Sequence, residues 1–132
     1  MKHQNMLRIM SVLSVVLLSL HVTHDILFGI SKADFSNFGA VFIFVALLCG
    51  PLLLAERRWG YAIMFISGFF ALGMPAMHMR GARYAERAAS ASGFFFVWTL
   101  FALGVLGVLC MILSAQGFWR LRSASKPAAN PA

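Results

Sequence analysis

The sequence predicts an all-α, membrane-embedded four-helix bundle whose N and C termini are both cytoplasmic. Of its 132 residues, 61% are hydrophobic and only 11% are charged, whereas soluble domains are near half apolar and a quarter charged. Four mostly apolar runs follow one another with short connections, and each is close to the about 20 helical residues that cross a hydrocarbon core of about 30 Å. The lipid bilayer is therefore the expected surroundings of the chain.

One domain accounts for nearly the whole chain. We expect the bundle to occupy residues 1–122 and a polar tail rich in Ala and Pro, 123–132, to be disordered. The expected spans are 9–30, 38–55, 59–79 and 93–115.

The first span follows Lys2 and Arg8, an arrangement that also opens a secretory signal peptide. No small-x-small cleavage pattern follows its apolar part, and apolar residues resume at Ile26, so we expect the segment to be retained as a span. In the second span, Gly50 and Pro51 predict a kink, because proline lacks the amide that the helix needs.

Glu56-Arg57-Arg58 predicts a turn in water, and Trp59 begins the third span with a ring favoured at headgroup level. The segment 80–92 has polar residues at three- and four-residue spacing, which predicts a short surface helix. The fourth span is the most apolar. No Gly-x-x-x-Gly pair occurs in any span, so scattered Gly, Ala and Ser are expected to allow close helix packing.

The distribution of basic residues predicts the orientation. Seven lie on the side of the termini and four on the other side, which favours cytoplasmic termini under the positive-inside rule. The seven are Lys2, Arg8, Arg57, Arg58, Arg120, Arg122 and Lys126, and the four are Lys32, Arg80, Arg83 and Arg87. The net charge of +7 is thus explained by topology rather than by nucleic-acid binding. Cys49 and Cys110 lie at different depths, so no disulfide is expected.

One polar patch interrupts the first span. His21, His24 and Asp25 lie at i, i+3 and i+4 and share one helical face. Only about a dozen apolar residues, roughly 18 Å of helix, precede His21, so the patch lies within the membrane if this helix crosses it. Placing an Asp near the middle of a span costs on the order of 2.5 to 3.5 kcal/mol on insertion scales. We therefore expect Asp25 to have an interaction partner within the bundle or a functional role.

The third span ends on the same side with Met77, His78 and Arg80. Counting depth at about 1.5 Å per residue places His78 level with His24 and Asp25, and His21 about one turn deeper. Two residues of the fourth span, Trp98 and Thr99, either line this outer half of the bundle or pack in its core.

Three chemical interpretations of the cluster remain open. In the first, His21, His24, Asp25 and His78 ligate copper or another transition metal, with Met77 as a soft thioether ligand. In the second, His21 or His24 pairs with His78 as axial ligands of a b-type haem, and Arg80 pairs with a propionate. In the third, an ion pair between Asp25 and Arg80 merely pins the first span to the third.

Other functions fit less well. A proton or small-solute carrier would need an oligomer, because four short helices barely enclose a path and no matching halves are visible. An enzyme is not expected, because the sequence shows no nucleophile with an orienting base and no room for a substrate pocket outside the membrane. We therefore expect a metal- or haem-binding membrane protein, or a structural or partner-binding subunit of a homo-oligomer or larger membrane complex.

Four strings carry a resemblance to a known group. They are His21-Val-Thr-His-Asp25, Glu56-Arg-Arg58 with Gly60, Met77-His-Met-Arg-Gly81 and Gly93-Phe-Phe-Phe-Val-Trp98. With these strings the chain resembles the small, uncharacterised four-span proteins of bacterial inner membranes over nearly its whole length. The resemblance implies the fold and a multi-pass location in a bacterial inner (cytoplasmic) membrane, and it implies no activity.

Overall fold

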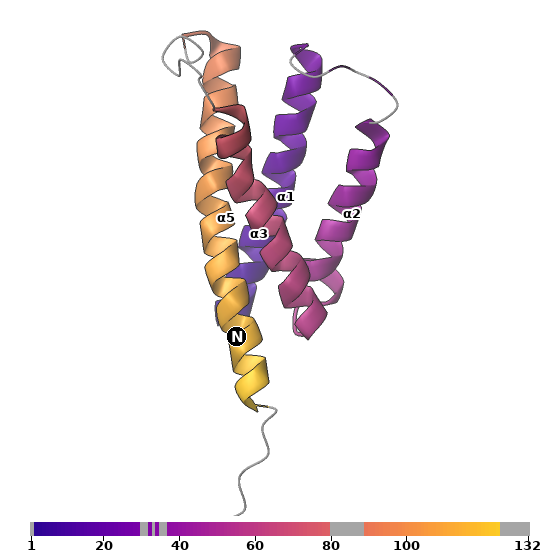
Figure 1. Ribbon diagram of the computed structural model, residues 1–132, viewed down its shortest axis with the longest axis vertical. Coiled ribbons are helices and arrows are strands. Elements are labelled where there is room, and N and C mark those ends of the chain that lie inside the picture. Colours follow the sequence, from indigo (N-terminus) through magenta and orange to yellow (C-terminus); the bar gives the residue numbers. More distant parts are fainter. Residues whose placement is uncertain (1, 30–31, 33, 35–36, 80–88, 125–132) are drawn as a thin grey trace, which may run out of the picture.

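The computed structural model describes residues 2–29, 32, 34, 37–79 and 89–124, and the regular structure in this part of the chain is α-helical throughout. The helices are α1 (Lys2–Leu27), α2 (Asn37–Leu53), α3 (Arg58–His78) and α5 (Ala91–Ala124) (Figure 1).

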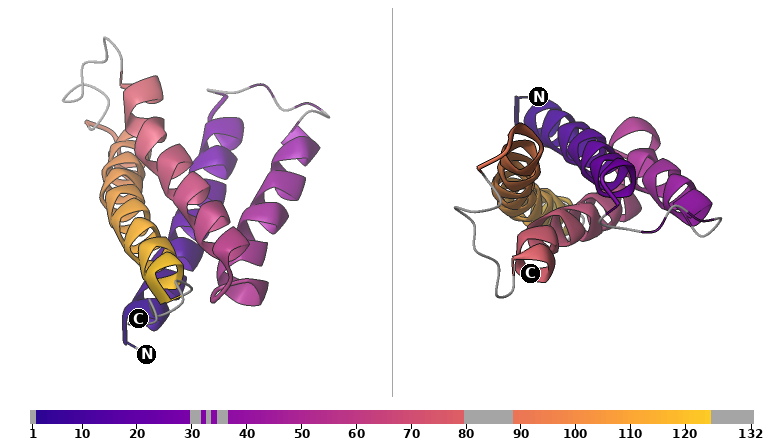
Figure 2. Two further views of the ribbon diagram at one scale, coloured as in Figure 1. Left: turned by 60° about the horizontal axis from the view of Figure 1, so that its bottom comes forward. Right: turned by 90° about the horizontal axis from the view of Figure 1, so that it is seen from above.

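Successive helices run in opposite directions, so the start of α1 and the end of α5 lie at the same end of the molecule (Figures 1 and 2). Helices α1, α3 and α5 pack against one another. Helix α2 lies to one side, against α1 and α3 (Figure 2). We call the end with the start of α1 the terminal end, and the opposite one the distal end.

Three helices, α1, α3 and α5, are long and apolar enough to cross a membrane. Helix α2 is apolar but has 17 residues, about 25 Å at 1.5 Å per residue, and is shorter than the expected span 38–55. Its Pro51 lies near the helix end, where the Leu54 amide donates to the Cys49 carbonyl over 3.1 Å. The length criterion thus supports three of the four expected spans.

The helix ends differ from the expected spans elsewhere as well. Helix α1 begins at Lys2 rather than at residue 9, and α5 continues to Ala124 rather than ending at 115. Ser123 and Ala124, which were expected in the disordered tail, therefore belong to α5. The rest of that tail, 125–132, and most of the expected surface helix in 80–92 lie outside the described residues.

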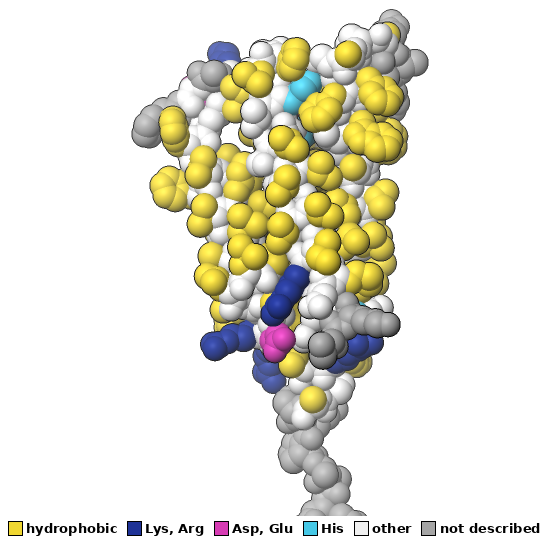
Figure 3. All heavy atoms as spheres, turned by 180° about the vertical axis from the view of Figure 1, so that it is seen from behind, with side chains coloured by type: hydrophobic (Ala, Val, Ile, Leu, Met, Phe, Trp, Pro, Cys, Tyr) yellow, Lys and Arg dark blue, Asp and Glu magenta, His cyan; other side chains and the backbone are white. Residues whose placement is uncertain are grey.

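Apolar and polar side chains are distributed as in a protein surrounded by lipid. Large apolar side chains cover the outside (Figure 3), among them Phe42, which is 77% exposed. Alongside its apolar core, the interior holds buried polar groups, and the described ones are Ser11, Ser14, His21, His24, Asp25, Ser67, Thr99 and Ser114. A soluble domain would expose the second set and bury the first, so this distribution supports a multi-pass membrane protein.

Glycines allow the close contact between α3 and α5. A Cβ atom on Gly68 would lie 2.8 Å from the Gly107 carbonyl oxygen, and one on Gly107 would lie 2.6 Å from the Gly68 carbonyl oxygen. No side chain fits at either position without moving the helices apart. The expectation that scattered small residues set the helix packing is confirmed here.

Basic side chains gather at the terminal end (Figure 3). Arg8 of α1 forms an exposed ion pair with Glu56, at 3.8 Å between Nη2 and Oε1. Trp59 at the start of α3 and Trp119 near the end of α5 are exposed at the same end, as expected for side chains at a membrane interface. Cys49 and Cys110 are free thiols, on helices that do not contact each other.

Candidate metal centre

The buried face of α1 carries the candidate site near the distal end. Its buried positions follow one helical face, and they are Leu7, Ser11, Ser14, Val15, Leu18, His21, His24 and Asp25. His21 is 0% exposed and Asp25 is 4% exposed. The predicted orientation of the polar patch toward the interior of the bundle is therefore correct.

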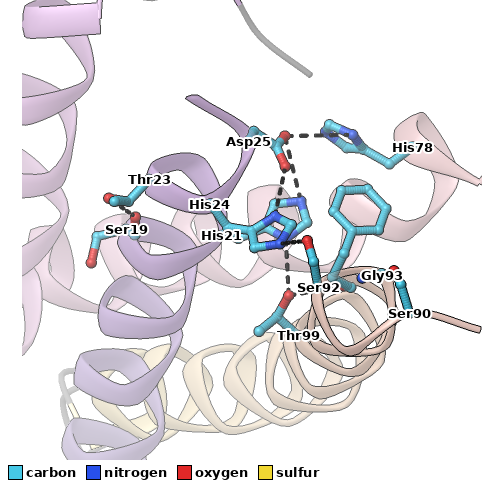
Figure 4. A network of polar contacts seen from close by, with 11 residues as sticks. Ser19, His21, Thr23, His24, Asp25, His78, Ser90, Ser92, Gly93 and Thr99 are labelled. Atoms are coloured by element: carbon cyan, nitrogen blue, oxygen red, sulfur yellow. Dashed lines mark hydrogen bonds and ion pairs between the residues drawn. The ribbon is translucent and has the colours of Figure 1, made fainter. Parts of the chain in front are cut away.

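Three imidazole rings surround the Asp25 carboxylate (Figure 4). Its Oδ2 lies 3.9 Å from His21 Nε2 and 3.9 Å from His78 Nδ1. Its Oδ1 lies 3.8 Å from His24 Nδ1. One nitrogen or oxygen each from His21, Asp25 and His78 lie within 4.8 Å of one another.

His78 comes from α3, where it is the last helical residue. Its ring meets the His21 ring edge to face, with 5.1 Å between the ring centroids. Its side chain is 25% exposed, whereas that of Asp25 is 5% exposed. The first and third helices thus meet at this cluster, as predicted from depth, and His78 is the member through which the cluster reaches the surface.

Three buried atoms of the cluster have no hydrogen-bond partner among the residues that the structure describes. Distances of 3.8 to 3.9 Å exceed the 2.7 to 3.2 Å, roughly, of an N–H···O hydrogen bond. His21 Nε2, His24 Nδ1 and Asp25 Oδ1 are all buried and unsatisfied. Such atoms are rare in folded proteins, because each costs on the order of 1 to 3 kcal/mol, and more when charged.

The outward-facing nitrogens of the two α1 histidines are satisfied by α5. His21 Nδ1 lies 3.0 Å from Thr99 Oγ1, and His24 Nε2 lies 3.0 Å from Ser92 Oγ (Figure 4). Each of these rings therefore uses one nitrogen toward α5 and presents the other toward Asp25. Histidines that bind metals are commonly held in this way by a partner on the second nitrogen.

Phe96 of α5 closes one side of the cluster. It is 2% exposed, and its ring centroid lies 4.9 Å from that of His21 and 5.8 Å from that of His78. An apolar wall strengthens electrostatic interactions inside the site, because it keeps water away.

The structure does not place every predicted site residue in the cluster. His21 is a central member rather than one lying a turn below it, and His24 contacts Asp25 from the α5 side. Met77 is 74% exposed, so its thioether points away from the cluster. Arg80, and with it the expected Asp25–Arg80 ion pair, lies outside the described residues.

Helix α5 supplies residues that sequence reasoning missed. Ser92 and Phe96 were not assigned to the site, and Thr99 was left without a partner. Trp98 is 63% exposed and does not line the interior. Spacing could have found the others, because 92, 96, 99 and 103 lie on one helical face that ends at the buried Leu103.

His21 and His78 lie too close together to hold a haem between them. The rings of His21 and His78 are in edge-to-face contact, so a haem between them would require α1 and α3 to move apart. Imidazole nitrogens with a carboxylate oxygen are suitable ligands for zinc, copper(II), nickel and iron. Comparison of the chain with protein-family models, curated proteins and solved structures finds no match.

Proposed function

We propose that this chain is a multi-pass protein of a bacterial inner membrane that binds one divalent transition-metal ion. His21, Asp25 and His78 are the ligands, and His24 lies beside them, with its Nδ1 3.8 Å from Asp25 Oδ1. In this proposal all four helices cross the bilayer, α2 with local thinning, and both termini are cytoplasmic. The distribution of basic and aromatic side chains at the terminal end supports that orientation.

The unsatisfied buried atoms are the observation that carries the proposal. Within the described part of the chain, His21 Nε2, His24 Nδ1 and Asp25 Oδ1 are buried and have no hydrogen-bond partner. A cation bound between His21 and Asp25 would satisfy the His21 nitrogen and the Asp25 carboxylate at once, and a nitrogen of His78 lies within 4.8 Å of both. Buried charges in proteins are otherwise paired or coordinate metals.

The separations are close to those of a coordination sphere. Bonds of about 2.0 to 2.1 Å in tetrahedral geometry place ligand atoms about 3.4 Å apart. The carboxylate oxygen of Asp25 lies 3.9 Å from a nitrogen of His21 and from one of His78. All three ligand atoms lie within 4.8 Å of one another, so binding of the ion requires them to approach by up to about 1.4 Å.

The donor set selects the class of metal. Nitrogen and oxygen donors suit zinc and similar divalent ions, whereas copper(I) prefers thiolate and thioether sulfur. Met77 points outward, and Cys110 contacts Ser11 and Ser14 further along the interior. We therefore propose a zinc-class ion rather than the copper(I) that a methionine ligand would favour.

The site is better suited to holding an ion than to catalysing a reaction or to letting a proton or solute cross the membrane. An apolar layer lies next to the cluster, about one helical turn from His21 along α1. It consists of Val15, Leu18, Leu47, Ala71 and Leu103. This layer closes the interior toward the terminal end, which disfavours a proton or solute path through a single copy.

A second candidate is a structural or partner-binding subunit without a cofactor. The observation in its favour is that Asp25 faces imidazoles from both α1 and α3. If a ring were charged, the contact would act as an electrostatic clamp between these helices. The two candidates give opposite predictions for Asp25→Asn, which are developed in the Discussion.

Metal content of the purified protein tests the proposal. The protein in mild detergent is stripped with a chelator, incubated with zinc and desalted, and bound zinc is measured by mass spectrometry. We expect about one equivalent in the wild type and a loss in His21→Gln. His3→Gln is the matched control, because His3 lies at the terminal end, where it hydrogen-bonds Gln116. Equal zinc in the wild type and His21→Gln would reject the site.

A further inference from the structure

We infer that Thr99 is a positioning residue that makes His21 present Nε2, rather than Nδ1, to the bound ion. This inference rests on the proposed metal site. It assigns α5 a specific role there: Thr99 controls the placement of a proton on a ligand that belongs to α1.

The two hydrogen bonds of the Thr99 hydroxyl determine which nitrogen of His21 carries a hydrogen. A threonine hydroxyl has one hydrogen to donate and lone pairs to accept with. Thr99 Oγ1 donates that hydrogen to the Phe96 carbonyl over 2.9 Å. With the hydroxyl hydrogen used in this way, the imidazole is the donor in the 3.0 Å contact between His21 Nδ1 and Thr99 Oγ1, so Nδ1 carries a hydrogen.

This placement leaves the other ring nitrogen for the metal. With Nδ1 protonated, a neutral imidazole has its lone pair on Nε2. That atom faces Asp25 Oδ2 at 3.9 Å and lacks a hydrogen-bond partner. The hydrogen bond on one nitrogen thus determines which nitrogen coordinates.

Burial keeps Thr99 as the hydrogen-bond partner of His21 Nδ1. His21 is 0% exposed and Thr99 is 1% exposed, so water does not readily replace the hydroxyl. The ring is also packed between Phe96 and His78, but ring packing does not distinguish one protonated nitrogen from the other. Thr99 is thus the contact that selects the tautomer.

Ser92 makes the corresponding contact with His24 but does not fix its tautomer. Its hydroxyl lies 3.0 Å from His24 Nε2, and either atom can donate. The inference is therefore restricted to Thr99, where the direction of the hydrogen bond follows from a second contact.

Three variants separate positioning from packing. Thr99→Val keeps the shape of the side chain and removes the hydroxyl, whereas Thr99→Ser keeps the hydroxyl. Ser114→Ala is the matched control, because it removes a buried α5 hydroxyl that has no hydrogen-bond partner. Loss of a partner on the second nitrogen typically weakens metal binding by about 10- to 100-fold.

The experiment measures zinc affinity by competition with a chelator. We expect Thr99→Val to weaken binding by about 10- to 100-fold, and Thr99→Ser and Ser114→Ala to stay within about threefold of the wild type. A wild-type affinity in Thr99→Val would overturn the inference. Failure of the wild type to bind zinc would instead reject the proposed metal site.

Nitrogen NMR on the wild type gives a second readout that does not require the variant to fold. In cadmium-substituted protein with labelled histidine, we expect the metal to couple to Nε2 of His21 and Nδ1 to carry a hydrogen. Coupling to Nδ1 of His21 would refute the role of Thr99 while leaving the metal site in place.

Discussion

Asp25→Asn should have opposite effects on the metal-free protein and on the zinc-bound protein. The substitution keeps the shape of the side chain and removes its charge. Without metal, the Asp25 carboxylate is buried, and its Oδ1 has no hydrogen-bond partner. Burial of a neutral amide costs less free energy than burial of a carboxylate. We therefore expect the metal-free variant to be as stable as the wild type or more stable.

The expected magnitudes follow from burial and linkage. An unsatisfied buried polar group costs about 1 to 3 kcal/mol, and more when charged, which sets the scale of the gain in the metal-free variant. Zinc at about 100 times its dissociation constant stabilises the wild type by about 2.7 kcal/mol. The variant should lose this zinc-dependent stabilisation, because a neutral amide replaces the anionic carboxylate that lies between His21 and His78.

Thermal unfolding in detergent, with and without zinc, measures both effects. Glu56→Gln is the matched control, because it removes an exposed carboxylate whose ion pair with Arg8 spans 3.8 Å. Surface pairs of this kind contribute about 0 to 1 kcal/mol, so the control should keep the zinc effect. A metal-free Asp25→Asn protein that is clearly less stable, combined with an unchanged zinc effect, would refute the reasoning and favour the electrostatic clamp.

The remaining predictions concern single side chains. His78→Gln should reduce zinc binding at least 10-fold in a chelator competition, because one of three ligands is removed; wild-type affinity would exclude His78 as a ligand. Met77→Leu should leave zinc and copper affinities unchanged, since Met77 is 74% exposed, and a drop in copper affinity would contradict this. Gly107→Ala should lower stability in thermal unfolding by about 1 to 3 kcal/mol, because its Cβ would lie 2.6 Å from the Gly68 carbonyl oxygen; Gly73→Ala, with open space around it, is the control and should have little effect.

The fold class could be predicted from sequence because apolar runs of this length leave few alternatives to helices in lipid. Helix ends were less predictable. The prediction stopped the fourth span where apolar residues end, yet α5 continues through Trp119 and Arg120 to Ala124. Such residues form helix readily outside the hydrocarbon core, so apolarity alone does not mark the end of a helix.

The α1 part of the site could also be predicted, because His21, His24 and Asp25 share a face by spacing alone. The relative depth of His21 and His78 in the membrane could not be predicted. Counting residues assumes that helices run straight along the membrane normal, but α3 is inclined relative to α5 (Figure 1). The supporting contacts of Ser92, Phe96 and Thr99 depend on how α5 packs, which periodicity does not determine.

X-ray absorption of the zinc-bound protein tests the central claim most directly, because it reports the donor atoms around the ion. We expect a shell of nitrogen and oxygen at about 2.0 to 2.2 Å with the outer scattering of at least two imidazoles, from His21 and His78. A sulfur shell, or a shell without imidazole scattering, would contradict the account.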